Sequence, residues 1–146
     1  VGGLFVLDCI ASGCAWVDME QSGVDVLISA PQKGWSAPPS AGLVMLRADA
    51  LERCRAAQST SFAIDLGKWL TIMDAYLGGG HAYHATMPTD GLRAFHAAML
   101  ETRDAGFETL RAAQWQQGEG VRALLARHGV RSVAADGFGA PGVVVS

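Results

Sequence analysis

The chain has 146 residues, 50% of them hydrophobic, which is enough to bury a core as one domain. Its net charge of −3 provides no basic surface for nucleic acid or an anionic membrane. There is no long apolar stretch and no signal-peptide pattern, and the three cysteines have neither metal spacing nor a pairing pattern. We therefore expect a cytoplasmic protein with reduced thiols, no metal, and no nucleic-acid or membrane partner.

The first third of the chain predicts a small sheet. Apolar runs indicate strands at about 4–8, 24–29 and 42–47, with a short helix or turn at about 15–22 between the first two. The last two strands are separated only by a loop, 30–41, so we expect them to pair antiparallel. The expected sheet is otherwise parallel.

Helices dominate the middle of the chain. A short helix is predicted to begin near Ala48, and a longer one covers about 62–77 before three glycines stop it. A further helix is predicted to start near Pro88 or Thr89, to bend or break at Gly106 and to resume as far as Gly129.

The two ends of the chain both look like strands. Residues 130–133 and 142–145 predict strands of a second, smaller domain, joined by a turn rich in Gly and Pro. The first residues lead directly into the strand at 4–8, without an initiator Met. Domain boundaries usually fall in exposed polar linkers, so we expect this chain to be part of a longer polypeptide.

Lys33 follows the buried strand at 24–29, in the segment VDVLISAPQKGWSAPP. Burial lowers the pKa of an ammonium group and makes the amine a nucleophile toward a carbonyl, which is the chemistry of a Schiff-base lysine. The alternative is an exposed loop lysine that reaches water.

Asp8 ends the first predicted strand. The carboxyl ends of strands in an open α/β sheet form the ligand crevice, so Asp8 and Lys33 are expected to enter the same crevice. Pyridoxal phosphate requires such a pair, because a lysine holds its aldehyde and a carboxylate keeps its ring nitrogen protonated. Ile10 would share the face of Asp8 if the extended backbone continued, and would lie under the ring. The alternative role for Asp8 is to cap the following turn.

Two stretches carry a family resemblance: FVLDCIASGCAWVDMEQSGVDVLISAPQKGWSAPPSAGLVML and AYHATMP. They resemble the class V aminotransferases, within the fold-type-I pyridoxal-phosphate enzymes, and most of all the serine–pyruvate and alanine–glyoxylate group. The resemblance spans most of residues 4–88 and weakens beyond. Its specific part is Gln-Lys-Gly-x-x-x-Pro-Pro around Lys33, with Asp8 at the spacing that the family uses. Desulfurase-like relatives usually carry His where this chain has Gln32.

The resemblance implies an α/β fold with three parts and makes the chain an internal fragment. Residues 1–87 would belong to the C-terminal half of the large cofactor-binding domain, which has a mostly parallel sheet with an antiparallel edge strand. Residues 88–128 would be connecting helices, and 129–146 the start of a small α+β domain.

The resemblance also implies the residues that contact pyridoxal 5'-phosphate. Lys33 would form the imine and act as general base and acid, and Asp8 would hold the ring nitrogen protonated. Gln32 would donate to the phosphate. The full expected set comprises Asp8, Ile10, Gln32, Lys33, Tyr83 and Thr86.

The loop at 81–89, HAYHATMPT, has two interpretations. His81 and His84 are spaced as a metal pair could be, but no third ligand or adjacent carboxylate accompanies them. The resemblance instead implies that the hydroxyls of Tyr83 and Thr86 contact the cofactor phosphate of the neighbouring subunit, in a homodimer with shared active sites. Ordinary capping and packing are the structural alternative for these two hydroxyls.

The function implied is transamination of a small amino acid, alanine or serine, with glyoxylate or pyruvate as the 2-keto acid and ping-pong kinetics. One rival is another pyridoxal-phosphate reaction, by a lyase, an aldolase or a desulfurase-like enzyme. The other is a catalytically inactive assembly fragment.

Overall fold

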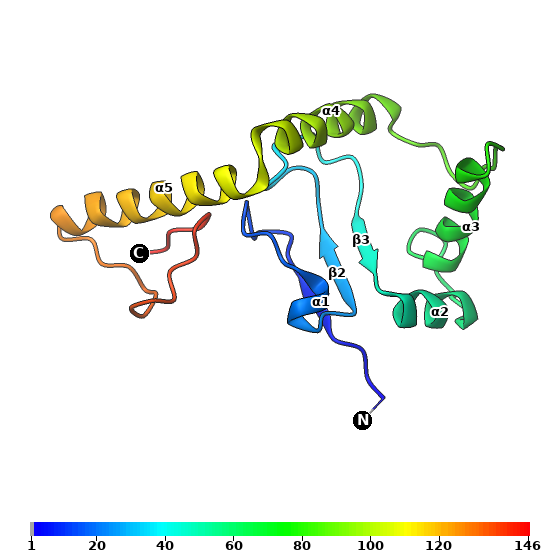
Figure 1. Cartoon of the computed structure of the whole chain (residues 1–146), viewed down its shortest axis with the longest axis horizontal. Helices are drawn as coiled ribbons and strands as arrows, with labels where there is room; N and C mark the ends of the chain where they lie inside the picture. The colour runs from blue at the N-terminus through cyan, green and yellow to red at the C-terminus, as the bar shows by residue number, and fades with distance from the viewer. Residues whose placement is uncertain (1) are drawn as a thin grey trace.

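A small mixed sheet lies at the centre of the computed structural model, which describes residues 2–146 (Figure 1). Its strands are β1 (Val6–Asp8), β2 (Val26–Ser29) and β3 (Leu43–Leu46), in that spatial order. β1 pairs parallel with β2, and β2 pairs antiparallel with β3. The sequence prediction of a sheet with an antiparallel edge strand is thus confirmed, although each strand is shorter than its apolar run.

The core lies on one face of this sheet. Leu7, Cys9 and Leu27 point to that face, and they pack with Val17 and Met19 from the segment that covers it. Cys9 and Leu27 are buried. Asp8 follows Leu7 in the strand, so it belongs to the opposite face, where Val6 is 52% exposed.

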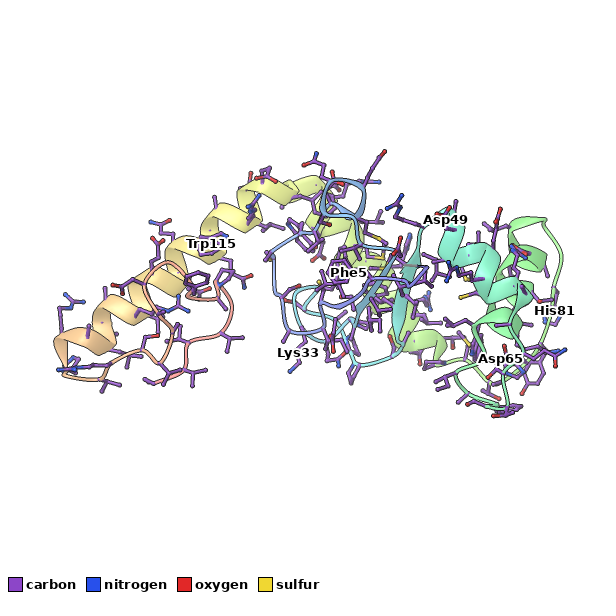
Figure 2. All side chains as sticks on the ribbon, turned by 90° about the horizontal axis from the view of Figure 1, so that it is seen from below. Phe5, Lys33, Asp49, Asp65, His81 and Trp115 are labelled. Carbon is purple, nitrogen blue, oxygen red and sulfur yellow. The ribbon has the colours of Figure 1, made fainter. Side chains whose placement is uncertain are left out.

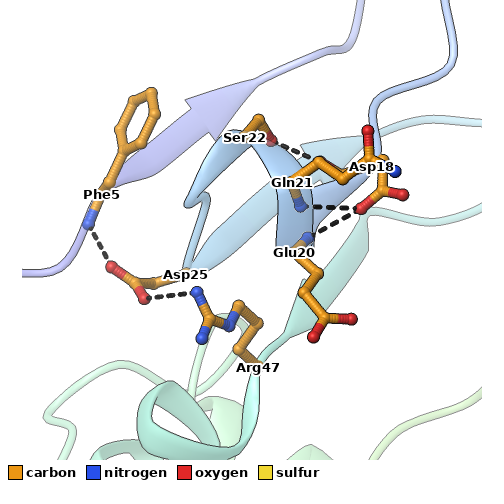
Figure 3. Close-up of polar contacts among 7 residues, drawn as sticks. All are labelled: Phe5, Asp18, Glu20, Gln21, Ser22, Asp25 and Arg47. Carbon is orange, nitrogen blue, oxygen red and sulfur yellow. Dashed lines mark hydrogen bonds and ion pairs between the residues drawn. The ribbon is translucent and has the colours of Figure 1, made fainter.

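Polar side chains fix the ends of the elements around this core (Figure 3). Asp18 precedes α1 (Met19–Ser22) and accepts hydrogen bonds from the backbone N–H groups of Glu20 and Gln21, both at 3.0 Å. Asp25 accepts a 2.8 Å hydrogen bond from the backbone of Phe5, and Arg47 lies 3.8 Å from the same carboxylate. Asp25 therefore ties the chain before β1 to the chain after β3.

Four longer helices follow the sheet: α2 (Ala48–Ala56), α3 (Leu66–Leu77), α4 (Thr89–Ala105) and α5 (Phe107–Arg127). α4 lies across the end of the sheet where β2 finishes, and α5 extends away from the sheet (Figure 1). The break that separates α4 from α5 falls at Gly106, as predicted, because this residue has a φ of 89° that a side chain would strain.

The start of α3 differs from the prediction of a helix from residue 62. Asp65 caps the helix by accepting from the backbone N–H of Lys68 at 3.1 Å. Ser61 accepts from the backbone of Ile64 at 3.3 Å, which holds the preceding residues in a turn. Local side-chain bonds therefore start this helix four residues later than its apolar spacing indicated.

The predicted strands at 130–133 and 142–145 are wrong. Only one backbone bond joins them, from Val133 N–H to the Val145 carbonyl at 3.0 Å, and an isolated pair of short strands is marginal. Arg122 on α5 instead binds the carbonyls of Ala140 and Val143. These carbonyls accept hydrogen bonds from an arginine side chain and not from the backbone of a neighbouring strand. The segment folds back along α5 as irregular chain (Figure 1).

Within residues 2–146, none of the helices combines the length and apolar character that crossing a bilayer requires.

Candidate functional site

The strand that ends at Asp8 and the strand that precedes Lys33 finish at the same edge of the sheet. Parallel pairing places Asp8 beside Ile28, one residue before the end of β2. Lys33 follows Ser29, the last residue of β2, by four positions. The sheet thus brings the segments that carry Asp8 and Lys33 to the same edge, as expected if both residues enter one ligand crevice.

Asp8 is exposed and has one oxygen already engaged. Its Oδ1 accepts a 2.9 Å hydrogen bond from the backbone N–H of Ile10, which is the turn-capping role named as the alternative. Its Oδ2 forms no hydrogen bond with any part of residues 2–146. One oxygen therefore orients the carboxylate and the other is available to a protonated ring nitrogen.

Ile10 does not lie on an extended strand. β1 ends at Asp8, and a turn begins at Ile10. The strand alternation that put Ile10 on the same face as Asp8 therefore does not apply, and the resemblance alone supports its contact with the cofactor ring. Ile10 is half-buried, whereas Gln32 is exposed.

Lys33 is exposed, so its expected burial is wrong for this chain. The loop turns tightly, since Ser36 N–H donates to the Lys33 carbonyl and Ala37 N–H donates to the Pro31 carbonyl, each at 3.0 Å. Pro31 is fully buried and anchors the loop below the lysine. Figure 2 shows Lys33 on the outside of this loop. Its ammonium group has no ion-pair or hydrogen-bond partner within residues 2–146 and is free to meet a ligand.

The two candidate loops touch each other backbone to backbone. A Cβ built on Gly34 would lie 2.2 Å from the carbonyl oxygen of Gly13, closer than real Cβ contacts allow. Gly13 itself has a φ of 63°. Sequence reasoning missed this contact, although a glycine directly after Lys33 was a signal for close approach. The contact holds the Asp8 and Lys33 loops together, which fits a cofactor that must reach both.

Tyr83 and Thr86 lie far from Lys33 within one chain. Their hydroxyls are 3.1 Å apart and both side chains are exposed. Figure 2 places His81, which opens their loop, at one end of the molecule and Lys33 near its middle. The loop that carries these hydroxyls and the loop that carries Lys33 are therefore separate regions of one subunit.

His84 has a packing role. Its ring lies 4.4 Å from that of Phe62 and 5.0 Å from that of Trp69, and its Nε2 is 3.0 Å from the Phe62 carbonyl. No group of three metal-ligating side chains occurs in the described part of the chain. The geometry favours a structural histidine at this position.

An apolar cavity of about 340 Å³ lies on the core face of the sheet, opposite Asp8. Cys9, Leu27, Trp16 and Trp35 are among the residues that line it. Burial is the largest cause that raises the pKa of the Cys9 thiol, with the Asp8 charge adding to the rise and a hydrogen bond with Ser12 opposing it. These surroundings keep Cys9 protonated, so it is a packing residue and not a nucleophile.

The chain is similar to several known aminotransferases. The chain is 32% identical to a 2-aminoethylphosphonate–pyruvate transaminase of Syntrophobacter fumaroxidans, over 85% of the chain and 34% of that protein. It is 31% identical to an alanine–glyoxylate aminotransferase of Felis catus, over 84% of the chain and 29% of that protein. The crystal structure of an alanine–glyoxylate aminotransferase from Nostoc sp. superposes with a TM-score of 0.83, at 20% identity, over 96% of the chain and 37% of that structure. No family model matches the chain.

The chain therefore has the fold of part of a fold-type-I aminotransferase. Its homologues are class V aminotransferases, as the motif around Lys33 predicted. The chain spans about a third of the length of the curated relatives it matches. Aminotransferases of this fold depend on pyridoxal phosphate.

Proposed function

We propose that the protein carrying this chain is a pyridoxal-phosphate-dependent aminotransferase. The observation that supports it most is the arrangement of Asp8 and Lys33: Asp8 ends β1, Lys33 follows the neighbouring parallel strand β2, and the loops after these strands pack through Gly13 and Gly34. A free ammonium group and an oriented carboxylate on touching loops are the two groups that this cofactor requires.

Each residue of the site has a separate task. Lys33 would hold the cofactor and, once displaced by the substrate amine, its Nζ would move a proton from the substrate α-carbon. Asp8 Oδ2 would accept a hydrogen bond from the ring nitrogen and keep it protonated, while Oδ1 stays fixed by the Ile10 N–H. Gln32, exposed beside Lys33, would donate its amide to the phosphate, and Ile10 would lie under the ring. The cofactor itself, when bound, supplies the carbonyl and the electron sink.

The proposed substrates are alanine or serine as donor, and glyoxylate or pyruvate as acceptor, in a ping-pong reaction. The alanine–glyoxylate relative supports the first pair. 2-Aminoethylphosphonate with pyruvate is a second candidate pair, favoured by the transaminases of that name, which match at up to 32% identity. The cytoplasmic location that the sequence predicts stays a prediction.

We also propose that two chains complete each site. Tyr83 and Thr86 carry exposed hydroxyls 3.1 Å apart on a loop remote from Lys33, so they can donate hydrogen bonds to a phosphate held by another subunit. A twofold homodimer would then place each pair beside the partner's Lys33.

The direct test replaces Lys33 in the complete protein. Lys33→Ala should abolish transamination, with a loss of more than about a hundredfold, because the variant lacks the amine that would hold the cofactor and move the proton. The sequence offers a matched control, since Lys68 on α3 is its only other lysine and is exposed. Lys68→Ala should retain parental turnover. Turnover by Lys33→Ala within tenfold of the parent would rule the proposal out.

The same assay separates the rival reactions. A transaminase given an amino acid without a keto acid converts its cofactor to pyridoxamine phosphate, in stoichiometric amount. A lyase, aldolase or desulfurase regenerates pyridoxal phosphate in each turnover and accumulates none. An inactive assembly protein would show neither conversion nor turnover.

A further inference from the structure

Four aromatic rings connect the Lys33 loop to the corner between α4 and α5. Trp35 follows Lys33 by two positions, and its ring lies 5.1 Å from that of Trp16 and 5.7 Å from that of Phe95. Trp16 in turn lies 5.1 Å from Phe107, the first residue of α5. Edge-to-face rings at these separations attract one another beyond their burial alone.

Polar bonds fix the same corner. The Trp16 Nε1–H donates to the Phe107 carbonyl at 3.0 Å. The Gln114 side-chain oxygen on α5 accepts from the backbone N–H of Cys14, one residue past the Gly13–Gly34 contact. The helices thus bond to the loop after β1, which packs on the loop that carries Lys33.

The lysine loop has little freedom of its own. Pro31 is fully buried at one side, and Ser36 adopts a φ of 54°, which is uncommon for a residue other than glycine. Phe95, against which Trp35 packs, is 8% exposed. Lys33 lies between these anchors and has no polar partner within residues 2–146, so the position of its side chain depends on the loop alone.

We infer that Trp35 is a positioning residue that holds the Lys33 loop against Trp16 and Phe95, so that the α4–α5 corner sets where the lysine amine meets the cofactor carbonyl. This inference rests on the proposed function, in which Lys33 binds that carbonyl. In this role Trp35 acts through the loop that carries Lys33.

The test compares Trp35→Ala with Trp35→Phe in the complete protein. Borohydride captures the bond between Lys33 and pyridoxal phosphate at timed intervals, and peptide mass spectrometry measures the rate. Trp35→Ala should slow capture about tenfold, because a misplaced amine loses its near-attack geometry. Trp35→Phe should recover the rate to within about threefold, because a phenyl ring still packs on Phe95. The equilibrium affinity for pyridoxamine phosphate, which forms no bond to the lysine, should change less than about threefold.

Trp115→Ala is the control, because Trp115 lies on α5 outside the aromatic cluster and lines a different cavity, together with Glu119 and Arg122. It should leave the capture rate unchanged. Capture by a folded Trp35→Ala protein at the parental rate would overturn the inference, and so would failure of Trp35→Phe to recover it.

A second readout needs no cofactor. Amide hydrogen exchange at Ser36 and Ala37, which bond within the lysine loop, should accelerate in Trp35→Ala and stay unchanged in Trp115→Ala. Equal exchange in parent and Trp35→Ala would overturn the inference. If Lys33 of the parent protein captured no cofactor at all, the proposed function would be wrong, and the inference that Trp35 positions Lys33 for the cofactor would be wrong too. The hydrogen-exchange rates would still show whether the α4–α5 corner orders the lysine loop.

Trp16→Phe covers the case in which Trp35→Ala does not fold. It keeps a ring against Trp35 and removes the donor to Phe107. Capture should slow about threefold, since the hydrogen bond that ties Trp16 to α5 is lost. An unchanged rate would contradict the role of the corner.

Discussion

Asp8 divides its two carboxylate oxygens between the fold and the cofactor. Oδ1 accepts from the Ile10 backbone at 2.9 Å, which fixes the side chain at the end of β1. Oδ2 has no partner within residues 2–146, so it can accept a hydrogen bond from a ligand while Oδ1 keeps its bond to the turn. The capping interpretation and the cofactor interpretation of Asp8, which the sequence left as alternatives, are therefore compatible.

Replacing Asp8 by Asn tests this division. The amide oxygen can still accept from the Ile10 N–H, so the turn should survive and pyridoxal phosphate should still bind Lys33. The amide cannot keep the ring nitrogen protonated, and removal of the substrate α-proton should slow by about a hundredfold or more. Stopped-flow absorbance with a single substrate measures that step. Asp49→Asn, on the exposed first turn of α2, is the control, and a normal rate in Asp8→Asn would remove Asp8 from its role.

The buried thiol of Cys9 gives a prediction about pH. Its pKa is raised mainly by burial, so the unfolded thiol ionises at a lower pH than the folded one. The free energy of unfolding should therefore fall as the pH rises above about 8.5, and the contribution is fully present below it. Urea unfolding at about pH 7.5 and about pH 9.5, for parent and Cys9→Ala, measures it. The parent should lose more stability than the variant over this interval, and a smaller loss would contradict the burial.

At the scale of elements, the site depends on a contact between two loops. Gly34→Ala would place a methyl group 2.2 Å from the Gly13 carbonyl oxygen, and backbone cannot move aside as a flexible side chain can. We expect a loss of about 1–3 kcal/mol in unfolding free energy together with weaker cofactor binding, because the loops must separate. Gly42→Ala, where nothing lies within 4 Å of the added Cβ, should change stability by less than about 0.5 kcal/mol. Denaturant titration compares them, and equal losses would contradict the contact.

The local sequence pattern predicted the strands and helices well where a single feature of the sequence determines the structure. The three apolar runs gave the sheet and its antiparallel edge, and Gly106 separated α4 from α5 as expected. The late start of α3 depends on the Asp65 cap, which competes with apolar spacing over a single turn. The strands predicted near the end did not form, since one backbone bond joins the two segments and Arg122 binds the Val143 carbonyl that a ladder could use.

The part of the candidate site that depends on the sheet could be predicted from the local pattern. Asp8 ends β1 and Lys33 follows β2, so the sheet brings their segments to one edge. The contact of Gly13 with Gly34 and the support from Phe107 and Gln114 join residues up to 100 positions apart. No local pattern specifies such pairs, because they arise from how the loops and helices pack.

At the scale of the whole molecule, the separation of Lys33 from the loop at Tyr83 predicts that subunits complement each other. Lys33→Ala and a Tyr83→Phe, Thr86→Ala double variant should each be impaired alone. Mixed and reassociated, they should recover about a quarter of parental activity, since half the dimers are mixed and each has one intact site.

The control for complementation combines all three substitutions in one chain and mixes it with Lys33→Ala. No mixed dimer then contains an intact site, so activity should not return. Absence of recovery in the first mixture, with reassociation shown by mass spectrometry of intact dimers, would place Tyr83 and Thr86 outside the partner's site.

The most direct measurement is borohydride reduction of the complete protein with pyridoxal phosphate, followed by peptide mass spectrometry. We expect a phosphopyridoxyl group on Lys33 and none on Lys68, the only other lysine of the chain, which is also exposed and serves as an internal standard. Both lysines meet the same cofactor concentration, so selective labelling reports a site and not general amine reactivity. An unmodified Lys33, or equal labelling of the two lysines, would contradict the claim that Lys33 holds the cofactor.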